Sequence, residues 1–169
     1  MYKLLFLFLM LCTFNAFAQQ DTLPLPLPQY LVTLEVPGFK LLLTDSATYY
    51  YKYQLPKKRP TIIIYFSPDC EHCQVEAQAL TDSLKYVKAA NIVYASYAPF
   101  VSIKNFDSTY KLSAQPNIKI GRDEKYYIPS FYRVRFTPFV ALYNRKGLLV
   151  RVYEGGTPII NLYKELKKL

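Results

Sequence analysis

The chain has 169 residues, of which 51% are hydrophobic, and it carries 21 Lys and Arg against 12 Asp and Glu. This length suits one domain with a well-filled core and is short for two. The cations are scattered, and the densest run, at 57–59, is followed by Pro60, which indicates a solvated turn rather than a nucleic-acid surface.

Residues 1–18, MYKLLFLFLMLCTFNAFA, have the form of a secretory signal peptide. Lys3 precedes an apolar run, and the small residues Ala16 and Ala18 form a cleavage site before Gln19. We expect cleavage near Ala18 and export to the periplasm or the extracellular space, where disulfides persist.

Two membrane-anchored alternatives are disfavoured. The unbroken apolar stretch at 4–11 is short for a transmembrane helix. A lipid anchor on Cys12 would follow the bulky Leu11, whereas bacterial lipoprotein signals resemble one another in having a small residue there. Cleavage would remove Cys12 and leave Cys70 and Cys73 as the only cysteines.

Residues 19–35 are interpreted as a Pro-rich N-terminal spacer that runs into the first strand, and residues 36–169 as the folded domain. Pro24, Pro26 and Pro28 alternate with Leu, which favours an extended spacer. Short strands are expected at 31–36, 39–43 and 48–54. The tyrosines of 48–54 could form a sugar platform, but aromatic residues are ordinary strand formers.

A central strand and a helix meet at the first of the two cysteines. Residues 61–66, TIIIYF, are typical of a strand buried on both faces. Apolar residues then recur at helical spacing from Glu71 to about Ala90, so Cys70 falls at a helix N-terminus. A second buried strand at 91–98 completes a β-α-β unit with parallel strands.

The rest of the chain predicts smaller elements. A short helix is expected at 103–110, a short strand around Ile118 and a short helix near Tyr132. The runs 139–143 and 148–153 indicate a hairpin whose loop includes Gly147, and residues 159–169 indicate a closing helix.

The stretch YFSPDCEHCQVEAQ at 65–78 holds Cys70, Cys73 and His72, the only histidine. Three such ligands so close together cannot surround a zinc ion, and a copper site remains open for the cysteine pair alone. A structural disulfide would close almost no loop and would stabilise little. We therefore expect no metal and no organic cofactor, and a chemical role for the pair.

Cysteines three residues apart in the first turn of a helix share a face and can form a disulfide. The helix dipole and free backbone N–H groups favour a thiolate at Cys70. A protonated His72 would add to this effect, whereas Glu71 opposes it.

The order of these elements resembles the α/β thioredoxin-like fold, a central mixed sheet flanked by helices, and most closely the exported TlpA/ResA-like thiol-disulfide oxidoreductases. The resemblance rests on IIIYFSPDCEHC at 62–73, on Glu76, and on YRVRFTPFVALYNRKGLLV at 132–150. The resemblance spans roughly Val36 to Gly156 and is therefore much more specific than an isolated C-x-x-C motif.

The resemblance implies a role for each matching residue. Cys70 would be the attacking cysteine and Cys73 the resolving one, while Glu76 would assist proton movement. Pro138 would be a cis-proline facing the dithiol, and Thr137 would offer its backbone to an extended client segment. From the residues alone, Glu76 is equally a solvent-facing helix residue and His72 a bystander.

Two positions depart from the family pattern. Asp69 stands where relatives usually carry Trp, and the chain has no Trp. Ile64 stands where cytosolic thioredoxins place a buried acid, which fits the exported branch and moves the proton role to Glu76. An anion at Asp69 opposes the thiolate.

The expected function is an exported thiol-disulfide oxidoreductase, with the resemblance favouring a reductase over an oxidase or isomerase. Its partners would be disulfide-containing client proteins and a membrane thiol donor, with no nucleic acid, and the protein would act as a monomer. The alternative is a non-catalytic thioredoxin-like binding module.

Overall fold

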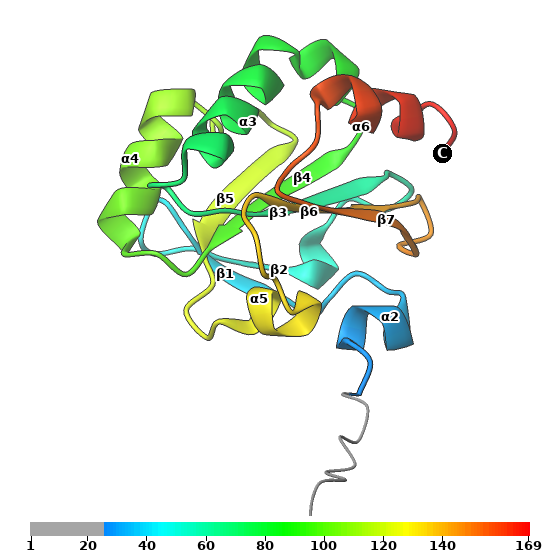
Figure 1. Cartoon of the computed structure of the whole chain (residues 1–169). Coiled ribbons are helices and arrows are strands. Elements are labelled where there is room, and N and C mark those ends of the chain that lie inside the picture. The colour runs from blue at the N-terminus through cyan, green and yellow to red at the C-terminus, as the bar shows by residue number, and fades with distance from the viewer. Residues whose placement is uncertain (1–25) are drawn as a thin grey trace, which may run out of the picture.

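The computed structural model describes residues 26–169, so the predicted signal peptide and its cleavage site lie outside the described residues. Seven strands of this part form one mixed sheet in the order β2-β1-β5-β4-β3-β6-β7 (Figure 1). The strands are β1 (Lys40–Leu43), β2 (Tyr49–Tyr51), β3 (Thr61–Tyr65), β4 (Asn91–Ser96), β5 (Ile118–Arg122), β6 (Phe139–Tyr143) and β7 (Leu149–Glu154). The helices are α2 (Gln29–Thr33), α3 (Glu71–Asp82), α4 (Phe100–Tyr110), α5 (Tyr127–Tyr132) and α6 (Ile159–Leu166), with short 3-10 turns η2 (Lys52–Gln54) and η3 (Leu84–Tyr86).

The centre of the sheet is the predicted β-α-β unit. β3 pairs in parallel with β4, and α3 crosses between them. β4 pairs in parallel with β5, while β6 pairs with β3 in the antiparallel sense. All five residues of β3 are buried, as its run of β-branched side chains predicted. The thioredoxin-like fold expected from the sequence is confirmed.

Helices cover both faces of the sheet and bury one apolar layer on each (Figure 1). Alternation along β3 sends Ile62 and Ile64 toward α3, α4 and α6, and Ile63 and Tyr65 toward α5. Within residues 26–169, no helix combines the length and the apolar character needed to cross a bilayer.

The expected strand at 31–36 is wrong. Residues Gln29–Thr33 form the short helix α2, which ends where Leu34 takes a left-handed conformation with φ 54°. Tyr30 packs on Tyr132 with ring centroids 5.5 Å apart, and this tertiary contact holds the helix. Only Glu35 makes a β-bridge, to Leu148.

The expected strand at 48–54 and the expected helix to Ala90 are both shorter than predicted. β2 ends at Tyr51 because the Gln54 side chain accepts a hydrogen bond from the Tyr51 N–H at 2.8 Å, which favours the turn η2. α3 ends at Asp82, and the chain continues through Ser83 into η3.

Candidate active site

Cys70 caps the N-terminus of α3, immediately after the turn that follows β3. Its backbone is extended, with φ −86° and ψ 116°, and its Sγ accepts a hydrogen bond from the Cys73 N–H at 3.3 Å. Cys70 is half-buried, whereas Cys73, one turn into the helix, is 1% exposed. Both cysteines are free thiols, so the site is a reduced dithiol with one accessible and one shielded sulfur.

Thr137 and Pro138 lie beside the dithiol although they are distant in the sequence. The Thr137 carbonyl oxygen is 3.5 Å from Cys70 Sγ and accepts a hydrogen bond from the thiol. The Thr137–Pro138 peptide bond is cis, as the resemblance implied, and it directly precedes β6. Phe136, just before it, is 64% exposed.

The two sulfurs differ in acidity. Burial alone would raise the pKa of Cys70, but side-chain hydrogen bonding with Cys73 and Thr137 and the backbone N–H groups of Cys73 and His72 lower it below the ordinary thiol value. Burial raises the pKa of Cys73 to about 12. The accessible sulfur is thus the better thiolate, and the shielded one holds its proton.

Glu76 lies one turn beyond Cys73 with its carboxyl group turned inward. Its Oε2 accepts a hydrogen bond from the Thr157 N–H at 3.2 Å, whereas its buried Oε1 has no hydrogen-bond partner among the described residues. Burial raises the pKa of Glu76 to about 7, against a smaller lowering by the Thr157 N–H. Glu76 is therefore not the solvent-facing helix residue that its position alone also allowed.

The loop between β7 and α6 closes over Glu76 through Gly156, a residue that the sequence analysis did not single out. A Cβ atom at Gly156 would lie 2.7 Å from Glu76 Oε2 and 2.9 Å from Pro138 Cγ. Gly156 also has φ 87°, a conformation that favours glycine. In the sequence, Gly155 and Gly156 together indicate a turn. They do not indicate this packing, because Glu76 and Pro138 are far from Gly156 along the chain.

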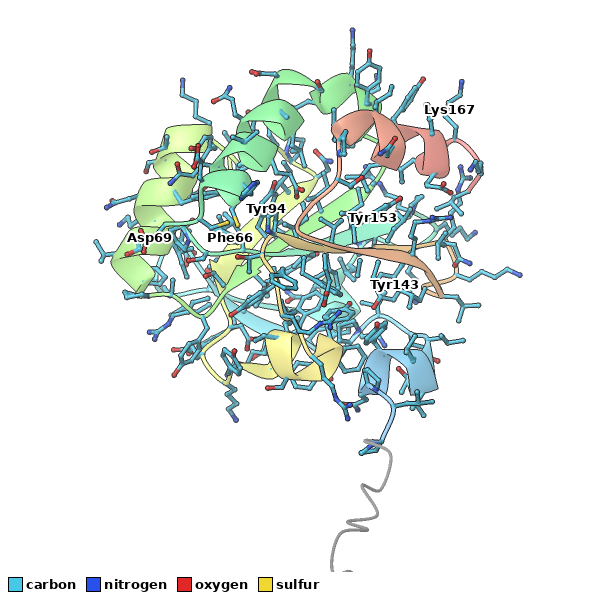
Figure 2. The ribbon with its side chains drawn as sticks, viewed as in Figure 1. Phe66, Asp69, Tyr94, Tyr143, Tyr153 and Lys167 are labelled. Carbon is cyan, nitrogen blue, oxygen red and sulfur yellow. The ribbon has the colours of Figure 1, made fainter. Side chains whose placement is uncertain are left out.

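Tyr94 is a second residue that the sequence analysis missed. Paired residues place Tyr94, Ile64, Val140 and Tyr153 in one row across β4, β3, β6 and β7, on the face that α3 covers. Figure 2 marks Tyr94 between the sheet and α3. Burial raises the pKa of Tyr94 well above its ordinary value, and the nearby Glu76 and Cys73 raise it further. Tyr94 is therefore a neutral phenol beneath the dithiol.

Asp69, Glu71 and His72 lie around the start of α3 and have exposed side chains. None of them makes a side-chain hydrogen bond or ion pair within residues 26–169. Glu71 and His72 line, together with Glu76, a hollow of about 560 Å³ between α3 and the start of α6. In the described part of the chain, no three His, Cys, Asp or Glu side chains converge as metal ligands would.

Comparison with known proteins defines the class. Residues 51–169 match the family model described as a thioredoxin-like domain, which covers most of the chain. The chain therefore belongs to the thioredoxin-like domain family. None of the curated proteins matches it significantly.

Several solved structures share the fold. A secreted Mycobacterium tuberculosis disulfide oxidoreductase, described as homologous to Escherichia coli DsbE, is 20% identical with a TM-score of 0.65, over 78% of this chain and 96% of that one. DsbF of M. tuberculosis is 17% identical with a TM-score of 0.67, over 79% and 98%. The exposed lipoprotein thioredoxin of Streptococcus pneumoniae is 19% identical with a TM-score of 0.61, over 79% and 100%. At these identities the likeness establishes the fold, and family membership supports the prediction of a redox enzyme.

Proposed function

We propose that this protein is an exported thiol-disulfide oxidoreductase that reduces disulfides in client proteins. The observation that carries the proposal is the asymmetry of the dithiol. Cys70 is accessible at a helix N-terminus with a lowered pKa, while Cys73 is buried in the same helix, three residues before Glu76 and its inward-facing carboxyl group. A structural disulfide needs none of these features.

In the first step, the Cys70 thiolate attacks one sulfur of the client disulfide. A sulfur–sulfur bond forms between Cys70 and the client, the client's own bond breaks, and the departing client sulfur takes a proton from solvent. The carbonyl oxygen of Thr137 is 3.5 Å from Cys70 Sγ, which supports the proposal that Thr137 offers its backbone to an extended client segment.

In the second step, Cys73 resolves the mixed disulfide. Its thiol must lose a proton first, because a thiol with a pKa of about 12 is a weak nucleophile at neutral pH. Glu76 accepts that proton, and the Cys73 thiolate attacks Cys70 Sγ. The bond between Cys70 and Cys73 forms, the second client sulfur leaves and is protonated, and two electrons have passed to the client.

The direction of exchange and the location complete the proposal. Dithiols of this kind span roughly −270 to −120 mV, so the family resemblance, rather than the geometry, favours a reductase. Export is supported by the composition of residues 1–18 and by solved relatives described as secreted or exposed. A reductase that acts in such a compartment needs a donor of thiol electrons, for which a membrane protein is the natural source, and we propose that the enzyme itself acts as a monomer.

Single-cysteine variants test the assignment. The Cys73→Ser variant should hold clients on Cys70 as mixed disulfides until reductant is added, while Cys70→Ser should capture almost none. Non-reducing gels after incubation with oxidised insulin measure both. Trapping by Cys70→Ser alone would reverse the roles. Failure of the wild type to reduce insulin, with no trapping by either variant, would favour the non-catalytic binding module.

A further inference from the structure

A strongly basic surface lies at the end of the sheet opposite the dithiol. β3 runs from Thr61 to the residues just before Cys70, and Thr61 is paired with Tyr143, where the β6–β7 loop begins. At this end, a hollow of about 440 Å³ has six cations in its lining. They are Lys52, Lys57, Lys58, Arg59, Arg145 and Lys146.

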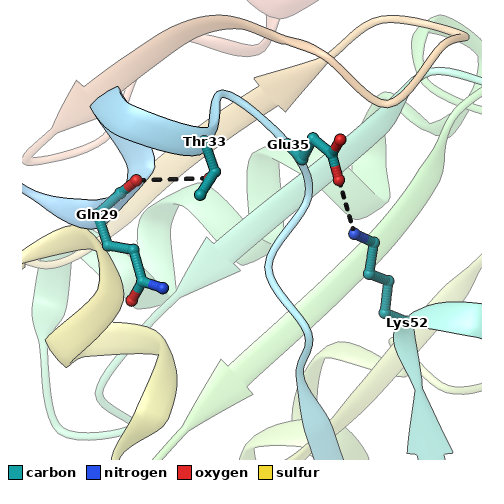
Figure 3. Close-up of polar contacts among 4 residues, drawn as sticks. All are labelled: Gln29, Thr33, Glu35 and Lys52. Atoms are coloured by element: carbon teal, nitrogen blue, oxygen red, sulfur yellow. Dashed lines mark hydrogen bonds and ion pairs between the residues drawn. The ribbon is translucent and has the colours of Figure 1, made fainter.

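This basic hollow is not visible in the sequence. Residues 57–59 alone indicate a solvated turn, and the fold adds Arg145 and Lys146 from the β6–β7 loop. Among the lining residues, Glu35 is the one acid, and it forms an ion pair with Lys52 at 3.5 Å (Figure 3). The basic hollow thus keeps a large excess of positive charge.

The cations also differ in how they are held. Arg59 donates hydrogen bonds to the backbone carbonyls of Lys88 and Ala89, so it is fixed against the domain. Lys57, Lys58, Arg145 and Lys146 form no ion pair within residues 26–169, and all four are exposed. Four cations are therefore available to an anionic partner.

An exposed apolar rim borders the basic hollow. Its members are Leu31, Val32, Leu34 and Leu148, each between 43% and 68% exposed. The Leu34 carbonyl accepts a hydrogen bond from the Leu149 N–H at 2.7 Å, and Glu35 bridges to Leu148, so α2 lies beside the start of β7 (Figure 1). Glu35 lines the hollow and directly follows Leu34, which joins the two surfaces.

We propose that the basic hollow and its apolar rim dock the protein on an anionic phospholipid bilayer, with the dithiol facing away from the membrane. Clusters of four to eight Lys and Arg attract anionic headgroups, and apolar side chains beside them insert into the interface. A soluble polyanion would leave the apolar rim uncovered, and a second copy would bring like charges together. The N-terminal segment also joins the domain at α2, on this surface.

Vesicle sedimentation of the chain from Gln19 onward tests the electrostatic part. The triple variant Lys57→Gln, Arg145→Gln, Lys146→Gln removes three cations of the hollow. The matched control, Lys104→Gln, Lys125→Gln, Lys164→Gln, removes three cations elsewhere. Each cation near an anionic surface is expected to raise the partition coefficient about fivefold, so the first variant should bind phosphatidylglycerol vesicles roughly a hundredfold more weakly than the control.

The absence of Trp from the chain allows a direct probe of the apolar rim. Val32→Trp places a single fluorophore on the rim, and Val101→Trp places one at the N-terminus of α4, where the native side chain is also exposed. Phosphatidylglycerol vesicles should shift the emission of Val32→Trp to the blue and leave that of Val101→Trp unchanged. Vesicles of phosphatidylcholine alone should shift neither.

Other outcomes would overturn the proposal. Equal vesicle binding by the two triple variants would mean that net charge alone attracts the protein. Binding of inorganic polyphosphate through the hollow, without vesicle binding, would identify a site for soluble polyanions. A blue shift of Val32→Trp that grows with protein concentration in the absence of vesicles would identify a dimer interface. None of these measurements uses thiol chemistry, so each is independent of the proposed redox function.

Discussion

Glu76 differs from an ordinary glutamate on a helix surface because its carboxyl group is buried against a backbone N–H. Its pKa of about 7 lies near neutral pH, where a carboxyl group with this pKa can both accept and release a proton. Cys73, one turn earlier, is the sulfur that must be deprotonated. In the proposed mechanism the Cys73 thiol is the proton donor and the Glu76 carboxylate is the acceptor.

Replacing Glu76 tests this pairing. In wild-type protein, resolution of a mixed disulfide should accelerate as pH rises through about 7, because Glu76 becomes a base. Glu76→Gln should lose that rise and resolve roughly a hundredfold more slowly at pH 8. Stopped-flow release of a fluorescent client measures the rate. The control variant Glu71→Gln, which removes an exposed carboxylate from the same helix, should keep the rise in rate near pH 7. A rise near pH 7 in Glu76→Gln as well would refute the role of Glu76 as proton acceptor.

At the scale of single residues, the sequence predicted those site residues that belong to a recognisable sequence motif. Cys70, Cys73, Thr137 and Pro138 belong to recognisable local patterns, and the fold brings them together. Gly156 belongs to no such pattern, because its importance comes from the space it leaves. Only a glycine fits between Glu76 and Pro138, and this becomes clear only when the three segments that carry these residues are placed together.

At the scale of elements, the loop that joins β7 to α6 is the connection that shapes the site. Thr157 holds Glu76 through its N–H, and Gly155 and Gly156 both have positive φ, of 80° and 87°. A Cβ atom added at Gly155 would meet no other atom within 4 Å, whereas Gly156 is enclosed. The two glycines share a left-handed backbone but differ in packing.

Alanine substitutions at Gly155 and Gly156 test this difference in packing. Gly155→Ala should lose roughly 1–2 kcal/mol of stability from left-handed strain alone. Gly156→Ala should lose about 1–3 kcal/mol more, because its Cβ displaces Glu76 or Pro138. Urea unfolding of both variants measures the free energies of unfolding. Equal losses would show that the loop yields without disturbing the site, and an unchanged rate profile for Gly156→Ala would agree with that result.

Elements with a strong local sequence pattern were predicted well, and those that depend on tertiary contacts were not. β3 and β6 are continuous apolar runs in the sequence and are buried strands in the structure. Residues 31–36 alternate weakly, and the packing of Tyr30 on Tyr132 decides in favour of a helix. Tyr132 lies far along the chain from α2, so the pattern at 31–36 cannot include this contact.

At the scale of the whole molecule, the dithiol and the basic hollow lie at opposite ends of the sheet. The carboxyl end of β3 leads to the dithiol, while its amino end and the β6–β7 loop form the basic hollow. A protein held at the second surface would present the first to clients. The same fold places a buried carboxyl group at the centre of the reactive end, and burying an ionisable group makes stability depend on pH.

Stability should depend on pH through Glu76. Its pKa is about 7 in the folded protein and 4.5 in an unfolded chain, so between these values the folded state binds the additional proton. The free energy of unfolding is therefore highest, as far as Glu76 affects it, below about pH 4.5. It falls as pH rises through 7. The loss is complete above 7 and amounts to about 3 kcal/mol.

Glu76→Gln removes this dependence, because the amide has no proton to lose. We expect the variant to gain about 3 kcal/mol over wild type between pH 4.5 and pH 7.5, measured by urea unfolding of both proteins under reducing conditions. A difference that stays constant with pH would mean that water reaches the carboxyl group and that Glu76 titrates as an exposed residue. Such a result would remove the basis for proton transfer from Cys73 while leaving the roles of Cys70 and the hollow untouched.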